Sequence, residues 1–163
     1  MHGELRELYQ EVILDHGRHP RNFRAVPTAP YQAKGDNPMC GDRIQVYLTL
    51  APDGAIADVA FDGRGCAISQ ASASLMTEIL PGKTRAEADA MFRALHEMCT
   101  QQDYDPAHHA DADAEAMERL AVLSGVREFP MRVKCATLAW HTVKAALAGD
   151  GKATTECTGT VEA

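Results

Sequence analysis

Apolar residues recur with two different periods along the chain, and the change of period separates helices from strands. Over residues 4–16 they form one stripe at helical spacing, which predicts an amphipathic helix. Between residues 44 and 50 apolar and polar residues alternate, a pattern typical of a half-buried strand. A turn signal at residues 52–54 separates this strand from a returning one over residues 56–61, so we expect an antiparallel hairpin. Residues 31–34 are a weaker candidate for a third strand.

Helical spacing returns after Cys66 and continues to the end of the predicted fold. The predicted helices cover residues 68–79, 85–99, 113–123 and about 135–148, with a polar loop over residues 101–110. The pattern therefore predicts an α+β fold, in which a small antiparallel three-stranded sheet packs against helices. We expect a single domain over residues 1–148 and a short, polar, disordered tail over residues 149–163.

Composition agrees with one globular domain and excludes several classes of protein. The chain has 163 residues, of which 45% are hydrophobic and 24% charged, so a packed core is expected. No apolar run approaches the ~20 residues that cross a bilayer, and the first residues lack a signal-peptide pattern. We therefore expect a cytoplasmic protein that does not act on membranes. The net charge of −7 argues against nucleic acid as the main partner, because contacts to phosphates need a basic surface.

The five cysteines say most about which kind of functional site the chain can have. They are Cys40, Cys66, Cys99, Cys135 and Cys157. An odd number at wide spacing is untypical of a disulfide framework and indicates a metal site, a reactive thiol, or both. Cys99 falls among inward positions of a predicted helix, so we interpret it as a core residue. Cys157 lies in the predicted tail, and His108 and His109 lie in the polar loop; we interpret these three as incidental.

The other three cysteines fall at predicted element boundaries. Cys40 lies in a turn before the first confident strand, Cys66 where the hairpin gives way to a helix, and Cys135 where the last helix is expected to begin. The start of a helix carries partial positive charge and unpaired N–H groups, both of which lower the pKa of a thiol. A functional metal or thiol site, a purely structural zinc site, and three small buried residues all remain open on this evidence.

A fourth ligand and compensating charges lie beside these cysteines. Asp42 follows Cys40 by two residues, so in an extended segment the two side chains point the same way. Three thiolates and one carboxylate can form a tetrahedral zinc site. Arg43, Arg64 and Lys134 are adjacent in sequence to the candidate ligands and are expected to offset their negative charge.

Three motifs carry a resemblance to a known family. They are Asn37-Pro-Met-Cys-Gly-Asp-Arg43, Gly63-Arg-Gly-Cys-Ala-Ile-Ser-Gln-Ala-Ser-Ala-Ser74 and Val133-Lys-Cys-Ala-Thr-Leu-Ala-Trp140. In this order they resemble the NifU/IscU-type iron–sulfur cluster assembly proteins, and residues 8–22 resemble the N-terminal signature of that family. Lys134 stands where IscU-type scaffolds have a histidine, and the segment around residues 82–110 is longer than theirs. Both departures resemble the SufU branch, which serves the SUF system.

The resemblance implies a SufE/IscU-like fold with a metal site at one end. The implied zinc ligands are Cys40, Asp42, Cys66 and Cys135, and Cys40 is the implied catalytic acceptor that becomes a persulfide. The implied partners are a PLP-dependent cysteine desulfurase of SufS type and the downstream iron–sulfur assembly machinery. On this interpretation the chain is a sulfur acceptor and desulfurase activator rather than a stand-alone enzyme. The alternative is a non-catalytic scaffold on which the same residues hold a labile Fe–S cluster or iron.

The implied mechanism requires an exchange of ligands. A thiolate held by zinc is less nucleophilic than a free one, whereas attack on a persulfide needs a reactive thiolate. We therefore expect a donor from the desulfurase, a histidine, to replace Cys40, so that Cys40 leaves already deprotonated.

Overall fold

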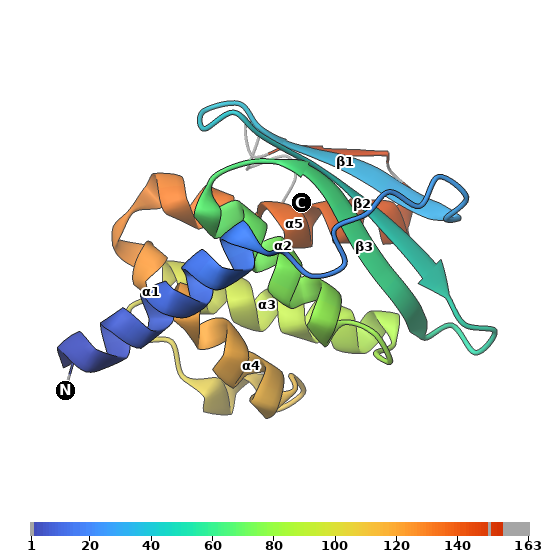
Figure 1. Ribbon diagram of the computed structural model, residues 1–163. Coiled ribbons are helices and arrows are strands. Elements are labelled where there is room, and N and C mark those ends of the chain that lie inside the picture. The colour runs from blue at the N-terminus through green and yellow to red at the C-terminus, as the bar shows by residue number, and fades with distance from the viewer. Residues whose placement is uncertain (1, 150, 155–163) are drawn as a thin grey trace.

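Three antiparallel strands, as the sequence predicts, form one layer of the molecule, and a short fourth strand extends this sheet (Figure 1). The computed structural model describes residues 2–149 and 151–154. The strands are β1 (Tyr31–Asn37), β2 (Asp42–Leu50), β3 (Ile56–Arg64) and a short β4 (Lys152–Thr154). Antiparallel pairing joins β1 to β2 and β2 to β3, while β4 adds to the free edge of β1 in parallel, giving the order β3-β2-β1-β4.

Helices form the second layer on one face of the sheet. They are α1 (His2–Arg18), α2 (Ala67–Ile79), α3 (Arg85–Thr100), α4 (Ala114–Leu120) and α5 (Pro130–Ala148), with 3-10 helices η1 (Pro106–His109) and η2 (Ala121–Glu128). Helix α5 packs against β1 and β2, and α2 packs against β3. Helix α1 packs on α2, and α3 lies farther from the sheet against α5 (Figure 1).

The core lies between these layers and is mostly apolar, with buried polar side chains on α2 and α5. Val46, Leu48 and Phe61 of the sheet are fully buried beneath the helices. Ser72 of α2 donates to the carbonyl of Ala136 and accepts a hydrogen bond of 3.1 Å from the indole of Trp140, so α2, which follows Cys66, is held to α5, which contains Cys135. Cys99 is also fully buried, which confirms its interpretation as a core residue.

The boundaries of the last helix differ from the prediction in a way that affects the site. Helix α5 begins at Pro130, not near Cys135, because proline lacks the N–H that the first helical turn would leave unpaired and is therefore compatible with that turn. The prediction that Cys135 opens a helix is therefore wrong. Cys135 lies inside α5, past the first turn, so the unpaired N–H groups at the start of the helix do not lower the pKa of its thiol.

Two further segments differ from the predicted pattern. The helix expected over residues 113–123 is divided into α4 and the following η2. Strand β4 falls within the segment for which a disordered tail is predicted, and Cys157 lies outside the described residues. No helix in the described part of the chain is both long enough and apolar enough to cross a membrane.

Candidate metal centre

A tight turn between β1 and β2 presents Cys40 and Asp42 together. The carbonyl oxygen of Asn37 accepts hydrogen bonds from the backbone N–H groups of Cys40 (3.2 Å) and Gly41 (2.9 Å). Gly41 has a φ of 74°, a left-handed conformation that glycine adopts without steric cost. Because Asn37 pairs with Asp42 across the two strands, the turn leaves Cys40 exposed near its tip and Asp42 buried at its base.

Cys66 lies beside Asp42, just past the end of β3, the strand that pairs with β2 on the edge opposite β1. It is the residue that precedes α2, directly after β3, and its side chain makes no capping hydrogen bond. Instead the Oδ1 atom of Asp42 accepts a hydrogen bond of 2.9 Å from the Cys66 N–H. A carboxylate at this end of α2 is favoured by the helix dipole, so the fold itself fixes the Asp42 side chain. Only glycine fits at position 65, because a Cβ there would lie 2.7 Å from Asp42 Oδ1 and would also contact Ser69 Oγ.

Cys135 completes the group from α5, where it is buried. Its Sγ lies 3.5 Å from the Sγ of Cys40. The ligand atoms of Cys40, Asp42 and Cys135 all lie within 4.8 Å of one another. Cys66 lies at the edge of this set, with its Sγ 3.9 Å from Oδ2 of Asp42. The four residues that the sequence singles out as candidate ligands are thus brought to one end of the sheet.

The donor atoms fit a thiolate-rich tetrahedral metal. With Zn–S bonds of about 2.3 Å, two thiolates of a tetrahedral site are about 3.8 Å apart. The observed separation of 3.5 Å between Cys40 and Cys135 is close to this value, and so is the sulfur–oxygen separation of 3.9 Å. Soft sulfur donors with one carboxylate suit zinc or iron–sulfur chemistry and are unsuited to magnesium or calcium. The residues therefore fit a metal of this class.

The thiols of Cys66 and Cys135 shift each other's pKa in opposite directions. The neighbouring Cys135 thiol, helped by the backbone N–H of Ser69, lowers the pKa of the Cys66 thiol to about 6 against the opposing effect of burial. The pKa of Cys135 is raised, first by the neighbouring Cys66 and then by burial. The site therefore already supports one thiolate near neutral pH, and a cation is needed to stabilise the others.

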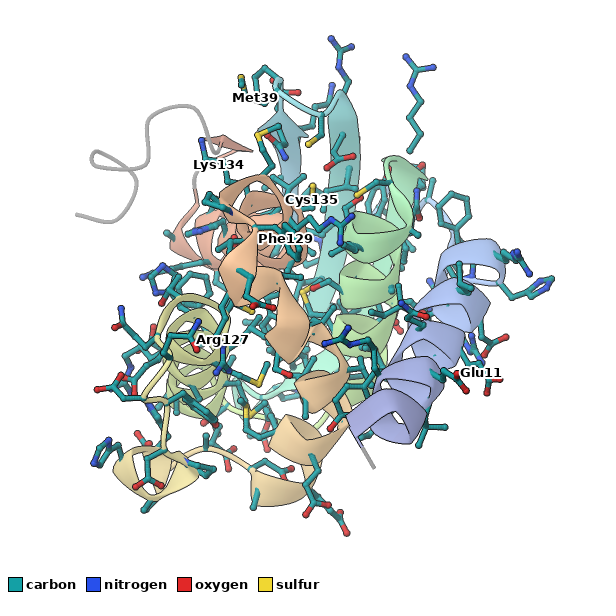
Figure 2. All side chains as sticks on the ribbon, turned by 90° about the vertical axis from the view of Figure 1, so that its left-hand side faces the viewer. Glu11, Met39, Arg127, Phe129, Lys134 and Cys135 are labelled. Atoms are coloured by element: carbon teal, nitrogen blue, oxygen red, sulfur yellow. The ribbon has the colours of Figure 1, made fainter. Side chains whose placement is uncertain are left out.

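Basic and apolar side chains surround the thiols. Figure 2 shows Met39, Lys134 and Cys135 together at the end of the molecule where β1 turns into β2, with Phe129 farther down the same face. Met39 is 61% exposed and Phe129 is 49% exposed, which is unusual for such large apolar side chains. Arg43 and Arg64 are opposite each other on β2 and β3, and both are exposed. That Arg43, Arg64 and Lys134 offset the charge of the ligands stays a prediction.

Histidines lie elsewhere in the fold. His16 is buried, with its Nδ1 2.7 Å from the hydroxyl oxygen of Ser74. His109 lies in the predicted polar loop, but its ring stacks on Tyr104 and its Nε2 lies 3.1 Å from Glu97. His141 is largely covered: it packs edge-on against Phe92, and burial lowers its pKa to about 4.

Two polar residues that hold the ligands are not among the predicted site residues. Asn37 and Ser69 are both buried, and both contact ligand atoms. Asn37 opens the first of the three family motifs, three residues before Cys40, and that position is the signal that could have marked it. Ser69 follows Cys66 by three residues at the start of a helix, a spacing that places the two side chains on the same face.

Comparison with known proteins points to one family. A family model described as "NifU-like N terminal domain" matches residues 8–136. The chain is 38% identical over 146 residues to the zinc-dependent sulfurtransferase SufU of Bacillus subtilis, an alignment that covers 90% of this chain and 93% of the relative. It is 37% identical over 145 residues to the iron–sulfur cluster assembly scaffold protein IscU of Streptococcus pyogenes, covering 89% of this chain and 86% of that one.

Solved structures show the same similarity. A putative iron–sulfur cluster assembly scaffold protein for the SUF system from Fervidobacterium islandicum superposes with a TM-score of 0.74 at 33% identity, covering 84% of this chain and 94% of that one. A nitrogen-fixing NifU-like N-terminal protein from Brucella abortus superposes with a TM-score of 0.74 over 86% of this chain and 92% of that one, at 23% identity, and so shows the shared fold.

Proposed function

We propose, from the premise that this chain belongs to the family of NifU-like N-terminal domains, that it is a zinc-dependent sulfur acceptor in iron–sulfur cluster assembly. The match to the family model and the similarity to the relatives confirm the family resemblance that the three cysteine motifs carry. The proposed zinc ligands are Cys40, Asp42, Cys66 and Cys135, and the proposed sulfur donor is a PLP-dependent cysteine desulfurase of SufS type. The accepted sulfur would then pass to the downstream assembly machinery.

The unequal exposure of two adjacent thiols is the observation that carries this proposal. Cys40 is exposed at the tip of a turn, whereas Cys135, only 3.5 Å away, is 2% exposed. Cys66 is also exposed, but its Sγ lies 3.9 Å from Asp42 Oδ2 and 3.8 Å from Ser69 Oγ, at the start of α2 and not on a turn. A scaffold needs all its thiols as permanent ligands, but a sulfur acceptor needs one thiol that can leave the metal and meet a partner. Cys40 has the position that this role requires.

The reaction proposed for Cys40 is an exchange at sulfur without net oxidation. The Cys40 thiolate attacks the outer sulfur of the desulfurase persulfide, forming a new S–S bond as the old one breaks. The outer sulfur moves to Cys40 with its proton, and the desulfurase cysteine leaves as a thiolate. Bound zinc would supply Cys40 in its deprotonated form. A donor from the partner that takes the place of Cys40 would free that thiolate for attack.

The surface around Cys40 supports docking of an acidic partner with an apolar patch. Met39, Phe129 and Met131 are exposed apolar side chains, with Met131 40% exposed. Met39 lies at the same end as Cys135, with Phe129 farther down that face (Figure 2), and Met131 lies about one helical turn before Cys135 on α5. Residues 129–148 contain no acidic residue, although the whole chain has a net charge of −7. A basic end on an acidic protein would orient it toward a negatively charged partner.

The test is sulfur acceptance by the Cys40→Ala variant. Zinc-loaded protein is incubated with a SufS-type desulfurase and cysteine, and persulfides are trapped by alkylation and located by mass spectrometry. We expect one persulfide on Cys40 of the unaltered protein and none on Cys40→Ala, which should retain zinc more weakly. Cys99→Ala, which removes a buried thiol, is the matched control. Full sulfur uptake by Cys40→Ala would contradict the proposal.

A scaffold function is the second candidate, because relatives of 37% and 34% identity carry that name and the same thiols can hold a cluster. Metal analysis of protein purified without chelator separates the two. About one zinc per chain without visible absorption supports the sulfur acceptor. Iron with acid-labile sulfide and a brown colour supports the scaffold.

A further inference from the structure

Asn37 contacts two of the candidate ligands although it is not itself one of them. It ends β1 and is fully buried. Its side-chain Nδ2 lies 3.4 Å from Oδ2 of Asp42 and 3.6 Å from the Sγ of Cys135, the latter an ordinary distance for a sulfur acceptor. A carboxamide nitrogen carries two protons, so one is available for each ligand atom.

The backbone of the same residue closes the turn that carries Cys40. Its carbonyl oxygen accepts from the N–H groups of Cys40 and Gly41, and its strand register places it opposite Asp42. Asn37 is therefore joined to three of the four candidate ligands, but in different ways. It contacts the ligand atoms of Asp42 and Cys135, whereas it holds only the main chain of Cys40.

We propose that Asn37 is a positioning residue that fixes the side chains of Asp42 and Cys135 at the metal. The inference rests on the proposed zinc site and concerns how two of its ligands are held in place.

The hydrogen bonds of Asp42 show why the amide is needed. Its Oδ1 is held by the Cys66 N–H at 2.9 Å, which leaves Oδ2 to face the thiols. Asn37 supplies the donor on that side. Because Asn37 and Asp42 are both fully buried, a buried acceptor that lost this donor would have no ready replacement from solvent.

The contacts of Asn37 with Cys40 and with Cys135 differ in kind. Among the described residues, the hydrogen bond to the Cys40 sulfur comes from the Cys135 thiol, and Asn37 reaches only the main chain at Cys40. At Cys135 the Asn37 amide contacts the sulfur itself.

Substitution of Asn37 by leucine is the direct test, because leucine has a similar size and no donor. Hydrogen-bond partners of metal ligands typically contribute 10–100-fold to metal affinity. We expect zinc affinity, measured by competition with a chromophoric chelator, to fall by about that factor in Asn37→Leu. The matched control is Gln32→Leu, which removes a carboxamide of the same strand that bonds to the carbonyls of Pro27 and Ala29. Its zinc affinity should stay within about twofold of the unaltered protein.

A purely structural role for Asn37 would be visible as a loss of stability that does not depend on zinc. Urea unfolding is therefore measured with excess zinc and with chelator. We expect the stabilisation that zinc adds to shrink in Asn37→Leu and to be unchanged in Gln32→Leu. Equal zinc stabilisation in Asn37→Leu and the unaltered protein would overturn the inference. An unaltered protein that binds no zinc would instead overturn the proposed function.

A measurement on the unaltered protein covers the case in which Asn37→Leu fails to fold. The side-chain amide resonances of Asn37 and Gln32 are compared by NMR in protein loaded with zinc and with cadmium. An amide that donates to a metal-bound sulfur senses the exchange of metal, so the Asn37 resonances should shift and those of Gln32 should not. Asn37 resonances that are the same with both metals would contradict the proposed contact.

Discussion

Gly65 shows how closely the candidate ligands are packed, because there is no space for a Cβ atom at this position. The space that it would need is taken by the Asp42 carboxylate and the Ser69 hydroxyl. We expect Gly65→Ala to displace the carboxylate and weaken zinc binding by about tenfold or more, as measured by chelator competition. Gly125→Ala is the control, because a Cβ there meets open space. Equal zinc affinities of the two variants would show that Asp42 is not held where its oxygen must bind.

At this scale the sequence predicts the ligands better than it predicts their supports. Cysteine and aspartate are recognised as candidate ligands by residue type, and their positions around turns single out Cys40, Asp42 and Cys66. The residue types of Asn37 and Gly65 do not indicate a role at a metal. Their roles depend on distances to residues that are far apart in sequence, such as Asn37 to Cys135, and only the folded chain sets those distances.

Helix α3 shows that an element can be stabilised independently of the metal site. The side chain of Thr84 accepts a hydrogen bond of 3.1 Å from the N–H of Glu87, and Glu87 accepts one of 2.9 Å from the N–H of Thr84. This capping box satisfies two N–H groups that the helix would leave unpaired. We expect Thr84→Ala to lower the free energy of unfolding by about 1 kcal/mol in urea titrations.

The same variant should leave sulfur acceptance unchanged, because α3 supplies none of the candidate ligands. A Thr84→Ala protein that is as stable as the unaltered chain would show that the cap is not formed in solution. A loss of sulfur acceptance under conditions where the variant stays folded would show that α3 is coupled to the thiols.

Helices and strands are predicted well where the spacing of apolar residues agrees with the residues that mark the ends of elements. The hairpin of β2 and β3 and the start of α3 are examples, because alternation or a capping residue marks each of them. The start of α5 is missed because Pro130 is compatible with both a break and a first helical turn. Strand β4 is missed because three residues are too few for a period, and it forms only where the free edge of β1 is available.

The stability of the whole molecule should depend on pH through His141. Burial, together with the charges of His96 and Lys144, lowers the pKa of His141 from 6.5 to about 4. Below pH 6.5 the unfolded chain binds a proton that the folded chain does not, so stability is full above pH 6.5 and falls as the pH drops toward 4. The loss on reaching pH 4 should be about 3 kcal/mol.

His141→Phe removes the titrating group and should flatten this part of the pH profile in urea titrations at a series of pH values. His19→Gln, which replaces an exposed histidine, should keep the slope of the unaltered protein. An unchanged slope in His141→Phe would mean that His141 is not buried in its neutral form.

At the scale of the molecule, the fold buries two of the candidate ligands and carries Cys40 out on a turn. The sheet and α5 hold Asp42 and Cys135 inside, and the turn between β1 and β2 carries Cys40 to the surface among exposed apolar and basic residues. Native mass spectrometry of the zinc-loaded chain, after incubation with a SufS-type desulfurase and cysteine, detects metal and transferred sulfur in one spectrum. The account predicts a species with one zinc and one added sulfur atom, the latter absent from Cys40→Ala. A chain that takes up no sulfur, or that instead accumulates iron and sulfide, would contradict it.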